Sequence, residues 1–359
     1  MSSKLRVGLL YGGRSGEHEV SVRSARSVAG ALDRDAFELV ALGVAPDGRW
    51  YSTESGEVPG AAVVGPGQGA AVTPAGDSGR LHLLSCDSGT TVAEVDVVFP
   101  VLHGPGGEDG TVQGLCEVFG VPYVGAGVMG SAIGMDKDVH KRLLRDAGIP
   151  VVRFEAVYRD EWVANAERVR ERLAALGERV FVKPANLGSS VGISKVHDPA
   201  ELGPALDTAF RHDRKAVVEV ALDAREIECA VLGNRDPHAS VLGEIAPGEE
   251  FYSYDDKYAA GSAARLLIPA PLDEELSDRI RGLAVRGYRV LGLRGMARVD
   301  FFLERASGHV YLNEPNTLPG FTSISMYPKL WQASGLPYSA LISKLIELAL
   351  AWQRDGRTG

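Results

Sequence analysis

The 359 residues, 45% hydrophobic and 24% charged, suit a soluble protein of two or three domains. A formal net charge of -9, with no basic run and no run of eighteen apolar residues, argues against a nucleic-acid partner and against attachment to a membrane. Three cysteines without CxxC spacing predict buried thiols rather than a disulfide framework or a zinc site, and the absence of a secretory-signal pattern favours a cytoplasmic protein.

The first unit, about residues 1–125, alternates strand-like and helical stretches. Strands are expected over 5–11, 39–44 and 95–101. This alternation is typical of parallel α/β layering and predicts a Rossmann-like domain. The segment between Tyr51 and Arg80 is rich in Gly, Ala and Pro, so we expect a loop or an insert there.

Two α+β units are expected to follow, over about 126–219 and 220–359. In the first, helices are predicted over 136–148 and 160–177 and from Pro199, with strands VFVKP, VGISKV and AVVEVAL. In the second, the strands EIECAVL, SVLGEI, MARVDFFLE and HVYLNE accompany the helix DEELSDRIRGLAVRGYRVL and a C-terminal helix after Pro337. The fold class is therefore α/β followed by α+β.

One motif points to a different function. The sequence GAGVMG, Gly125 to Gly130, follows a strand-like VPYV and matches the GxGxxG pattern of dinucleotide-binding enzymes. An NAD-dependent dehydrogenase therefore remains an alternative. That pattern, however, needs an acidic residue at the end of the next strand, and Glu155 lies within VVRFEAVY rather than at its end. We favour a tight turn between domains.

Polar side chains on two successive predicted strands indicate a metal site. Residues two apart on a strand share a face, at about 6–7 Å, so Arg298 and Asp300 point together. The same holds for Glu314 and Asn316 on the next strand. Carboxylate and amide oxygens are ligands that Mg²⁺ takes alongside water and nucleotide phosphates. We predict two magnesium ions held by Asp300, Glu314 and Asn316; the alternative is an ion-pair ladder in which Arg298 is the counter-charge.

A second cluster supplies cations for phosphates. Lys183 ends the strand VFVKP, and the glycine-rich turn that follows can direct backbone N–H groups at an anion. The order of lysine and glycines differs from that of a Walker A loop. Lys137, near the start of an earlier helix, is a second candidate, although an ordinary exposed helix lysine fits the spacing equally well.

Together these motifs resemble the D-alanine–D-alanine ligase family of the ATP-grasp superfamily. The resemblance covers nearly the whole chain in order, through GGRSGEHEVS, LHGPGGEDG, MDK, VKPANLGSSVG, FYSYDDKY, GMARVDFF and NEPNTLPGFTSIS. It implies an ATP-grasp fold in which an N-terminal Rossmann-like domain and two α+β domains clasp ATP. It also implies a homodimer that joins two D-alanines through a D-alanyl phosphate and supplies peptidoglycan precursors, with ATP and two Mg²⁺ ions, or Mn²⁺, as cofactors.

The resemblance assigns the nucleotide-binding residues. Lysines 137 and 183 would contact the phosphates, and the GSSVG turn would close over them. The strand end at 219–222 would contact adenine. Glu226 would contact the ribose, and Lys257 would contact the γ-phosphate. The corresponding residues are Lys137, Lys183, Gly188, Ser189, Ser190, Val191, Glu219, Val220, Leu222, Glu226 and Lys257.

Substrate-binding and catalytic residues follow from the same resemblance. Glu17 and His103 would lie beside the first D-alanine; on spacing alone, Glu17 could equally cap a helix and His103 could be structural. Arg298 and the Gly320 N–H would stabilise the oxyanion of the tetrahedral intermediate. Ser325 and the Met326 amide would hold the carboxylate of the second substrate.

A polar stretch at about 246–264 is interpreted as a lid, because an acyl phosphate must be shielded from water. In this resemblance Tyr258 joins Glu17 and Ser189 in a hydrogen-bonded triad, and FYSYDDKY matches the D-alanine type rather than the D-lactate type. Other carboxylate–amine ligases, including a D-alanine–D-lactate enzyme, and a catalytically silent nucleotide-binding protein remain alternatives.

Overall fold

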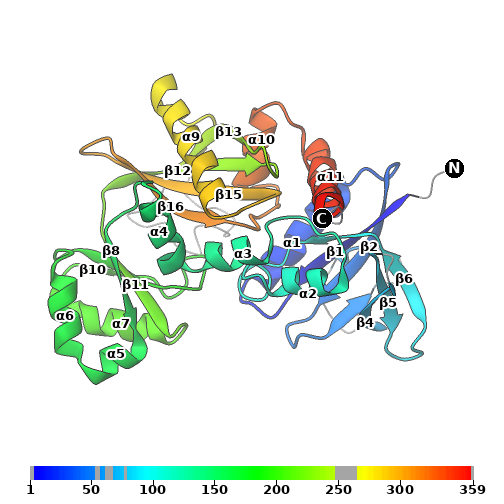
Figure 1. Ribbon diagram of the computed structural model, residues 1–359, viewed down its shortest axis with the longest axis horizontal. Coiled ribbons are helices and arrows are strands. Elements are labelled where there is room, and N and C mark those ends of the chain that lie inside the picture. The colour runs from blue at the N-terminus through cyan, green and yellow to red at the C-terminus, as the bar shows by residue number, and fades with distance from the viewer. Residues whose placement is uncertain (1–3, 53–56, 61–67, 77–78, 247–264, 357–359) are drawn as a thin grey trace.

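The computed structural model describes residues 4–52, 57–60, 68–76, 79–246 and 265–356, which form three sheets (Figure 1). Their strand orders are β6-β5-β4-β3-β2-β1-β7, β10-β9-β11-β8 and β14-β13-β12-β15-β16. In Figure 1 the first sheet lies at the right, the second at the lower left and the third at the top. None of the helices in the described ranges is long and apolar enough to cross a membrane.

The first sheet is parallel at its centre and antiparallel toward one edge. Strand β1 pairs in parallel with β2 and β7, while β3 to β6 continue from β2 as antiparallel neighbours. The elements are β1 (Leu5–Gly12), α1 (His18–Ala31), β2 (Phe37–Val44), β3 (Trp50–Ser52), β4 (Gln68–Pro74), β5 (Leu81–Ser85), β6 (Thr91–Val95), β7 (Val97–Pro100) and α2 (Thr111–Phe119).

The loop or insert expected between Tyr51 and Arg80 contains a strand, β4, so the segment is not a loop throughout. This strand pairs with β3 on one side and β5 on the other, so backbone hydrogen bonds hold it although its side chains are small. The cysteine prediction is also partly wrong: Cys116 and Cys229 are buried thiols, but Cys86 is exposed.

The second sheet is antiparallel and is covered by helices α5 to α7. The elements that follow α2 in the chain, up to the end of this sheet, are α3 (Val128–Met135), α4 (Lys137–Asp146), β8 (Phe154–Tyr158), α5 (Arg159–Ala164), α6 (Ala166–Ala174), β9 (Val180–Pro184), β10 (Ser194–Val196), η2 (Pro199–Glu201), α7 (Leu202–Phe210) and β11 (Lys215–Val220). The single helix predicted over 160–177 is two helices, because the side chain of Asn165 accepts a hydrogen bond from Arg168 N at 3.1 Å and starts a new helix there. The predicted strand VGISKV shortens to three residues.

The third sheet carries the remaining elements. These are β12 (Ala224–Leu232), β13 (His238–Ala246), β14 (Arg265–Leu267), α9 (Glu274–Val290), β15 (Met296–Glu304), β16 (Val310–Asn316), α10 (Met326–Ala333) and α11 (Tyr338–Gly356). Helix α10 was not anticipated from the sequence. Helix α11, at the C-terminal end, contacts α1 and β7, and its buried face shares a core with the first sheet. Helices α3 and α4 contact β16. Each sheet falls close to one of the three predicted domain ranges, and that division of the chain stays a prediction.

Candidate active site

A cleft of about 1310 Å³ lies where the three sheets face one another. Its wall contains nearly every residue predicted from the sequence to bind nucleotide, metal or substrate. These are Glu17, His103, Lys137, Lys183, Gly188, Ser189, Ser190, Glu219, Val220, Leu222, Glu226, Arg298, Asp300, Glu314, Asn316, Gly320, Ser325 and Met326. Val191 is not part of the wall, because its side chain is on the exposed side of the turn. Lys257 and Tyr258 lie outside the described residues.

The pairing of β15 with β16 brings the predicted metal ligands together. Asp300 lies opposite Glu314, and Arg298 lies opposite Asn316. Directly opposed residues on antiparallel strands have Cβ atoms about 4.5–5.5 Å apart, so both carboxylates and the amide share one patch. Oxygen Oδ1 of Asn316 is buried and accepts no hydrogen bond from any described residue.

These donors fit a magnesium ion that completes its shell with water and phosphate oxygens. A buried amide oxygen without a partner is costly, and a cation would satisfy it. Within the described ranges, no three His, Cys, Asp or Glu side chains converge as a ready metal cage. Mg²⁺ needs only one or two protein carboxylates when nucleotide phosphates supply other ligands, so this open patch suits it better than a closed cage would.

The ion pair proposed as the alternative is also present. Arg298 donates from Nε to Asp300 Oδ1 and from Nη2 to Oδ2, both at 2.7 Å. Its Nε lies 3.1 Å from Glu228 Oε2. Burial alone would lower the pKa of Arg298, but the charges of Asp300 and Glu228 outweigh it and raise that pKa well above its usual value. Arg298 is therefore a fixed cation at the cleft wall.

Buried lysines from α4 and β9 gather beside this patch. Lys183 on β9 and Lys141 on α4 both pair with the buried Glu219, with Lys141 Nζ 3.1 Å from Glu219 Oε2. Lys137 Nζ donates to Leu187 O at 2.6 Å. Burial would raise the pKa of Glu219, but the charges of Lys141 and Lys183 lower it to about 2. Two buried ammonium groups thus share one buried carboxylate, and Lys137 adds a third buried positive charge to this side of the cleft.

This charge imbalance indicates an anion site. Burial lowers the pKa of Lys137 and of Lys141, which means that their charged forms lack solvation. A buried charge is stable only when it is paired. Lys137 has Glu314 at 3.8 Å, an acid that is itself a predicted metal ligand. A polyphosphate would supply the missing negative charge.

The glycine-rich turn has a strained backbone next to these lysines. Ser189 and Ser190 have φ values of 53° and 60°, in the left-handed region that residues other than glycine seldom adopt. Such strain is concentrated at ligand-binding loops. The hydroxyl of Ser189 donates to Glu17 Oε1, which joins the turn to the first unit. Glu17 and Ser189, two members of the predicted triad, are thus in contact.

Two family models match the chain: "D-ala D-ala ligase N-terminus" over residues 6–126 and "D-ala D-ala ligase C-terminus" over residues 143–347. The D-alanine–D-alanine ligase of Thermoanaerobacter sp. (strain X514) is 49% identical over 354 residues, which are 97% of each chain. The D-alanine–D-alanine ligase A of Chromobacterium violaceum is 50% identical, over 97% of this chain and 95% of its own.

The chain belongs to the D-alanine–D-alanine ligase family. Solved structures agree. The D-alanine–D-alanine ligase from Coxiella burnetii superposes with a TM-score of 0.86 at 36% identity, covering 99% of this chain and 97% of its own. The VanG D-Ala:D-Ser ligase from Enterococcus faecalis gives a TM-score of 0.84 at 34% identity, covering 97% and 100%. The predicted family and fold class are confirmed.

The glycines of GAGVMG serve packing in this member of the family. Gly125 has a φ of 102°, and its carbonyl accepts a hydrogen bond from Arg294 at 3.0 Å. A Cβ on Gly130 would lie 3.0 Å from Gly292 O, so helix α3 packs closely on the turn before β15. Gly125 to Gly127 form the bend that leads into α3, and Val128 to Gly130 are the first residues of that helix, so the predicted turn is confirmed only for the first half of the motif.

Three functional candidates were missed in the sequence. Lys141 and Glu228 lie beside predicted site residues, and nothing in their spacing separates them from ordinary helix or strand positions. Glu108 lines the cleft, accepts from Gly104 N at 2.8 Å, and has its pKa raised to about 8 by burial and by Glu17. The acidic residues of LHGPGGEDG could have indicated it.

Near Glu108, His103 is buried and its Nε2 lies 3.1 Å from Ser24 Oγ. Burial lowers the pKa of His103, which keeps the ring neutral beside Glu17. Its side chain is therefore tied to α1 while it lines the cleft.

The other end of the cleft is formed by Gly320 and the start of α10. Ser325, which precedes α10, accepts a hydrogen bond from Thr322 N at 3.0 Å through its Oγ. A Cβ on Gly320 would lie 2.8 Å from that Oγ. The first amides of a helix have no intrahelical partner and favour an anion, so the N-terminal end of α10 at Met326 can accept a carboxylate.

At the predicted adenine hinge, two backbone donors are already used. Val220 N donates to Arg153 O and Ala221 N donates to Arg179 O, each at 3.0 Å. An adenine base would therefore meet the carbonyl oxygens of this strand end and the amide of Leu222.

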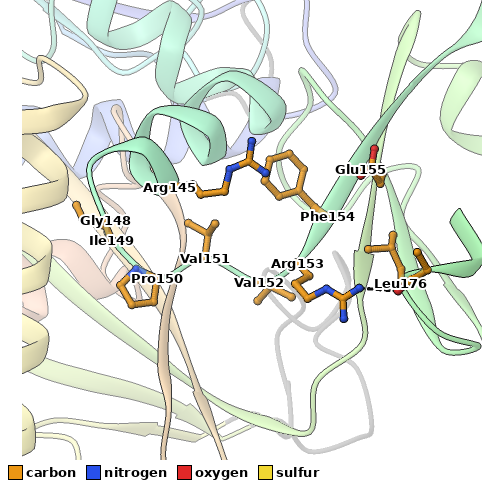
Figure 2. A pocket seen from close by; sticks show the side chains of 11 residues that line it. Arg145, Gly148, Ile149, Pro150, Val151, Val152, Arg153, Phe154, Glu155 and Leu176 are labelled. Carbon is orange, nitrogen blue, oxygen red and sulfur yellow. Dashed lines mark hydrogen bonds between the residues drawn. The ribbon is translucent and has the colours of Figure 1, made fainter. Parts of the chain in front are cut away.

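A second cavity has a volume of about 460 Å³ (Figure 2). It is bounded by the end of α4, by the linker 148–153 and by the end of α6. Figure 2 shows the guanidinium of Arg145 directed at the ring of Phe154, 5.6 Å from its centroid. None of the predicted site residues lines it.

Proposed function

We propose that this chain joins two D-alanines with ATP, forming D-alanyl-D-alanine, ADP and phosphate. The observation that carries the proposal is the patch of Asp300, Glu314 and the buried Asn316 oxygen, which lines one cleft together with the buried lysines at 137 and 183. A carboxyl group is a poor acylating agent, and phosphoryl transfer from ATP makes it reactive. Family membership supports the same reaction.

In the first step, the carboxylate of one D-alanine attacks the γ-phosphorus and ADP leaves. Lys137 and Lys183 would neutralise the phosphates and hold them near the turn at 188–192. Magnesium, two ions in this proposal, bound by Asp300, Glu314 and Asn316, would supply the charge that stabilises the transferring phosphoryl group. Glu17 would bind the ammonium of this first D-alanine, next to His103.

In the second step, the amine of the second D-alanine attacks the acyl carbon, and phosphate leaves as the C–N bond forms. The oxyanion of the tetrahedral intermediate would lie between Arg298 and the Gly320 N–H. Ser325 and the Met326 amide would bind the carboxylate of the attacking D-alanine. Because Arg298 is held by two carboxylates, its guanidinium is already oriented when substrate arrives.

The adenine and ribose contacts belong to the same proposal. The strand end at Glu219, Val220 and Leu222 would face the base, and Glu226 would face the ribose. The proposal also includes a homodimer, a cytoplasmic location and the supply of peptidoglycan precursors. Family membership supports all three.

The test is phosphate release from purified protein with ATP and Mg²⁺, with D-alanine, D-serine or D-lactate as substrate. D-Alanine alone should give one phosphate per dipeptide formed. D-Serine is included because a similar structure is titled a D-Ala:D-Ser ligase. Efficient use of D-lactate, or no phosphate with any substrate, would contradict the proposal. The variant Glu314→Gln, which removes the charge of one proposed metal ligand, should lose most of this phosphate release. Its control is Glu304→Gln, at the far end of β15, because Glu304 is not part of the cleft wall.

A further inference from the structure

Arg298 has two acidic partners that come from two different strands. Asp300, on the same strand β15, accepts two hydrogen bonds from Arg298, one from Nε and one from Nη2, both at 2.7 Å. Glu228, on the neighbouring strand β12, places Oε2 3.1 Å from Arg298 Nε. In the register of β12 with β15, Glu228 lies opposite Asp300, so both carboxylates approach the guanidinium from the same face of the sheet.

One of these partners has a second task in the proposed function. Asp300 is a proposed magnesium ligand, and its two oxygens cannot give full hydrogen bonds to Arg298 while they bind a cation. The Arg298 side chain is 18% exposed. A guanidinium left without a counter-charge in such surroundings is strongly destabilised. Metal binding at Asp300 therefore requires another anion for Arg298.

Glu228 is placed to be that anion. Its side chain is 6% exposed, it lines the cleft, and it lies on the central strand of the sheet rather than in a loop. It is not one of the predicted metal ligands. Because β12 pairs with β15 along its whole length, the backbone of Glu228 is fixed opposite Asp300 whether or not Asp300 binds the metal.

We propose that Glu228 is a positioning residue that keeps Arg298 paired and aimed into the cleft while Asp300 binds the divalent metal. This inference rests on the proposed function, because it assumes a metal at Asp300. It makes metal affinity depend on a residue that does not bind the metal: without Glu228, Arg298 competes for Asp300.

The inference is tested by direct binding of Mn²⁺, measured by electron paramagnetic resonance with a non-hydrolysable ATP analogue present. The Glu228→Gln variant should bind Mn²⁺ about tenfold more weakly, or worse, than the wild type. Its melting temperature without metal should stay close to that of the wild type, because Arg298 then keeps Asp300.

The matched control is Glu94→Gln. Arg6 is also held by an aspartate and a glutamate, with Nε 3.0 Å from Asp96 Oδ2 and Nη2 2.7 Å from Glu94 Oε2, on strands outside the cleft. Removing Glu94 deletes the second carboxylate of a similar trio, and Mn²⁺ affinity should not change.

The deciding comparison repeats Glu228→Gln in an Arg298→Met background. With no guanidinium to compete for Asp300, the substitution should change Mn²⁺ affinity by less than about twofold, so the two changes are strongly non-additive. An equal loss in both backgrounds would mean that Glu228 acts on the metal directly or through its charge alone, and would overturn the inference. So would wild-type affinity in Glu228→Gln. If the wild type itself binds no Mn²⁺ with nucleotide, the proposed metal site fails instead.

Discussion

Replacing Lys141 with methionine tests whether this lysine belongs to a charge network around Glu219 or is an ordinary helix residue. Lys141 is 1% exposed and its Nζ lies 3.1 Å from Glu219 Oε2, while Lys183 holds the other oxygen of the same carboxylate. The methionine fills a similar volume without a charge. Glu219 then keeps one ammonium instead of two.

The expected loss of stability is about 3 kcal/mol. Removing one partner of a buried ion pair costs about 3–5 kcal/mol, because the other charge stays buried. We take the lower end, since Lys183 still pairs with Glu219 and since burial lowers the pKa of Lys141, so its own charge is unfavourably solvated. An exposed pair such as Lys344 with Glu347 contributes less than about 1 kcal/mol, so Lys344→Met is the control.

The loss should depend on pH in a defined direction. The folded-state pKa of Glu219 is lowered to about 2, below the value of about 4.3 for an unfolded glutamate. Its contribution is therefore fully present above pH 4.3 and lost as the pH falls toward 2. The difference between wild type and Lys141→Met should be constant near neutral pH and should shrink in acid.

Two measurements check this prediction. Urea unfolding at several pH values gives the stability difference, and calorimetry with ADP in the absence of metal gives nucleotide affinity. Affinity should fall on the order of tenfold, about 1.4 kcal/mol, because Lys183 must stay with Glu219 instead of meeting phosphate. A variant as stable as Lys344→Met, with unchanged affinity for ADP, would refute the reasoning.

Four further substitutions give distinct outcomes. Glu314→Gln should lose roughly a hundredfold or more in turnover while its melting temperature stays within a few degrees; a much lower melting temperature would instead favour a structural ion pair. Lys215→Met removes the cation between the half-buried Asp136 and the buried Asp138 at the start of α4 and should cost about 3 kcal/mol in urea unfolding; a loss below about 1 kcal/mol would contradict this. Gly107→Ala places a Cβ 2.4 Å from Leu102 O and should destabilise the protein by roughly 2 kcal/mol, whereas Gly114→Ala meets no atom within 4 Å and should be neutral or stabilising by calorimetry.

The strands that carry the proposed chemistry could be predicted because their signals are local. MARVDFFLE has the alternation of a half-buried strand, and β15 forms over those residues, Met296–Glu304. Helix α9 begins where Asp273 caps it, with Leu276 N donating to its side chain at 2.8 Å. Strand β4 could not be predicted from its side chains, because small residues in GAAV pack weakly and only pairing with both neighbours makes the strand.

Contacts between units could be predicted only where the family resemblance names them, as for Ser189 with Glu17. A local feature also escaped prediction: Asn165 divides a predicted helix because its side chain competes for a backbone N–H, which helical periodicity does not reveal. The sequence left two alternatives for Asp300 and Glu314: ligands of a metal ion, or partners of Arg298 in an ion-pair ladder. In the structure Asp300 is the counter-charge, and the pairing of the consecutive strands β15 and β16 brings Glu314 and Asn316 beside it, as the predicted patch requires.

The charge balance of the cleft explains why these contacts belong together. Lys141 and Lys183 share one buried carboxylate, Glu219, and Lys137 lies 3.8 Å from Glu314, while Arg298 on β15 shares two acids. Each of the two clusters alone is costly, since the lysines carry an excess of buried positive charge and the Asn316 amide oxygen has no hydrogen-bond partner among the described residues. A polyphosphate with a divalent cation corrects both at once, because its anionic oxygens meet the lysines while the cation meets Asp300, Glu314 and Asn316. Nucleotide and metal should therefore bind with strong positive coupling, and Mn²⁺ affinity measured with and without the ATP analogue should differ by at least about tenfold.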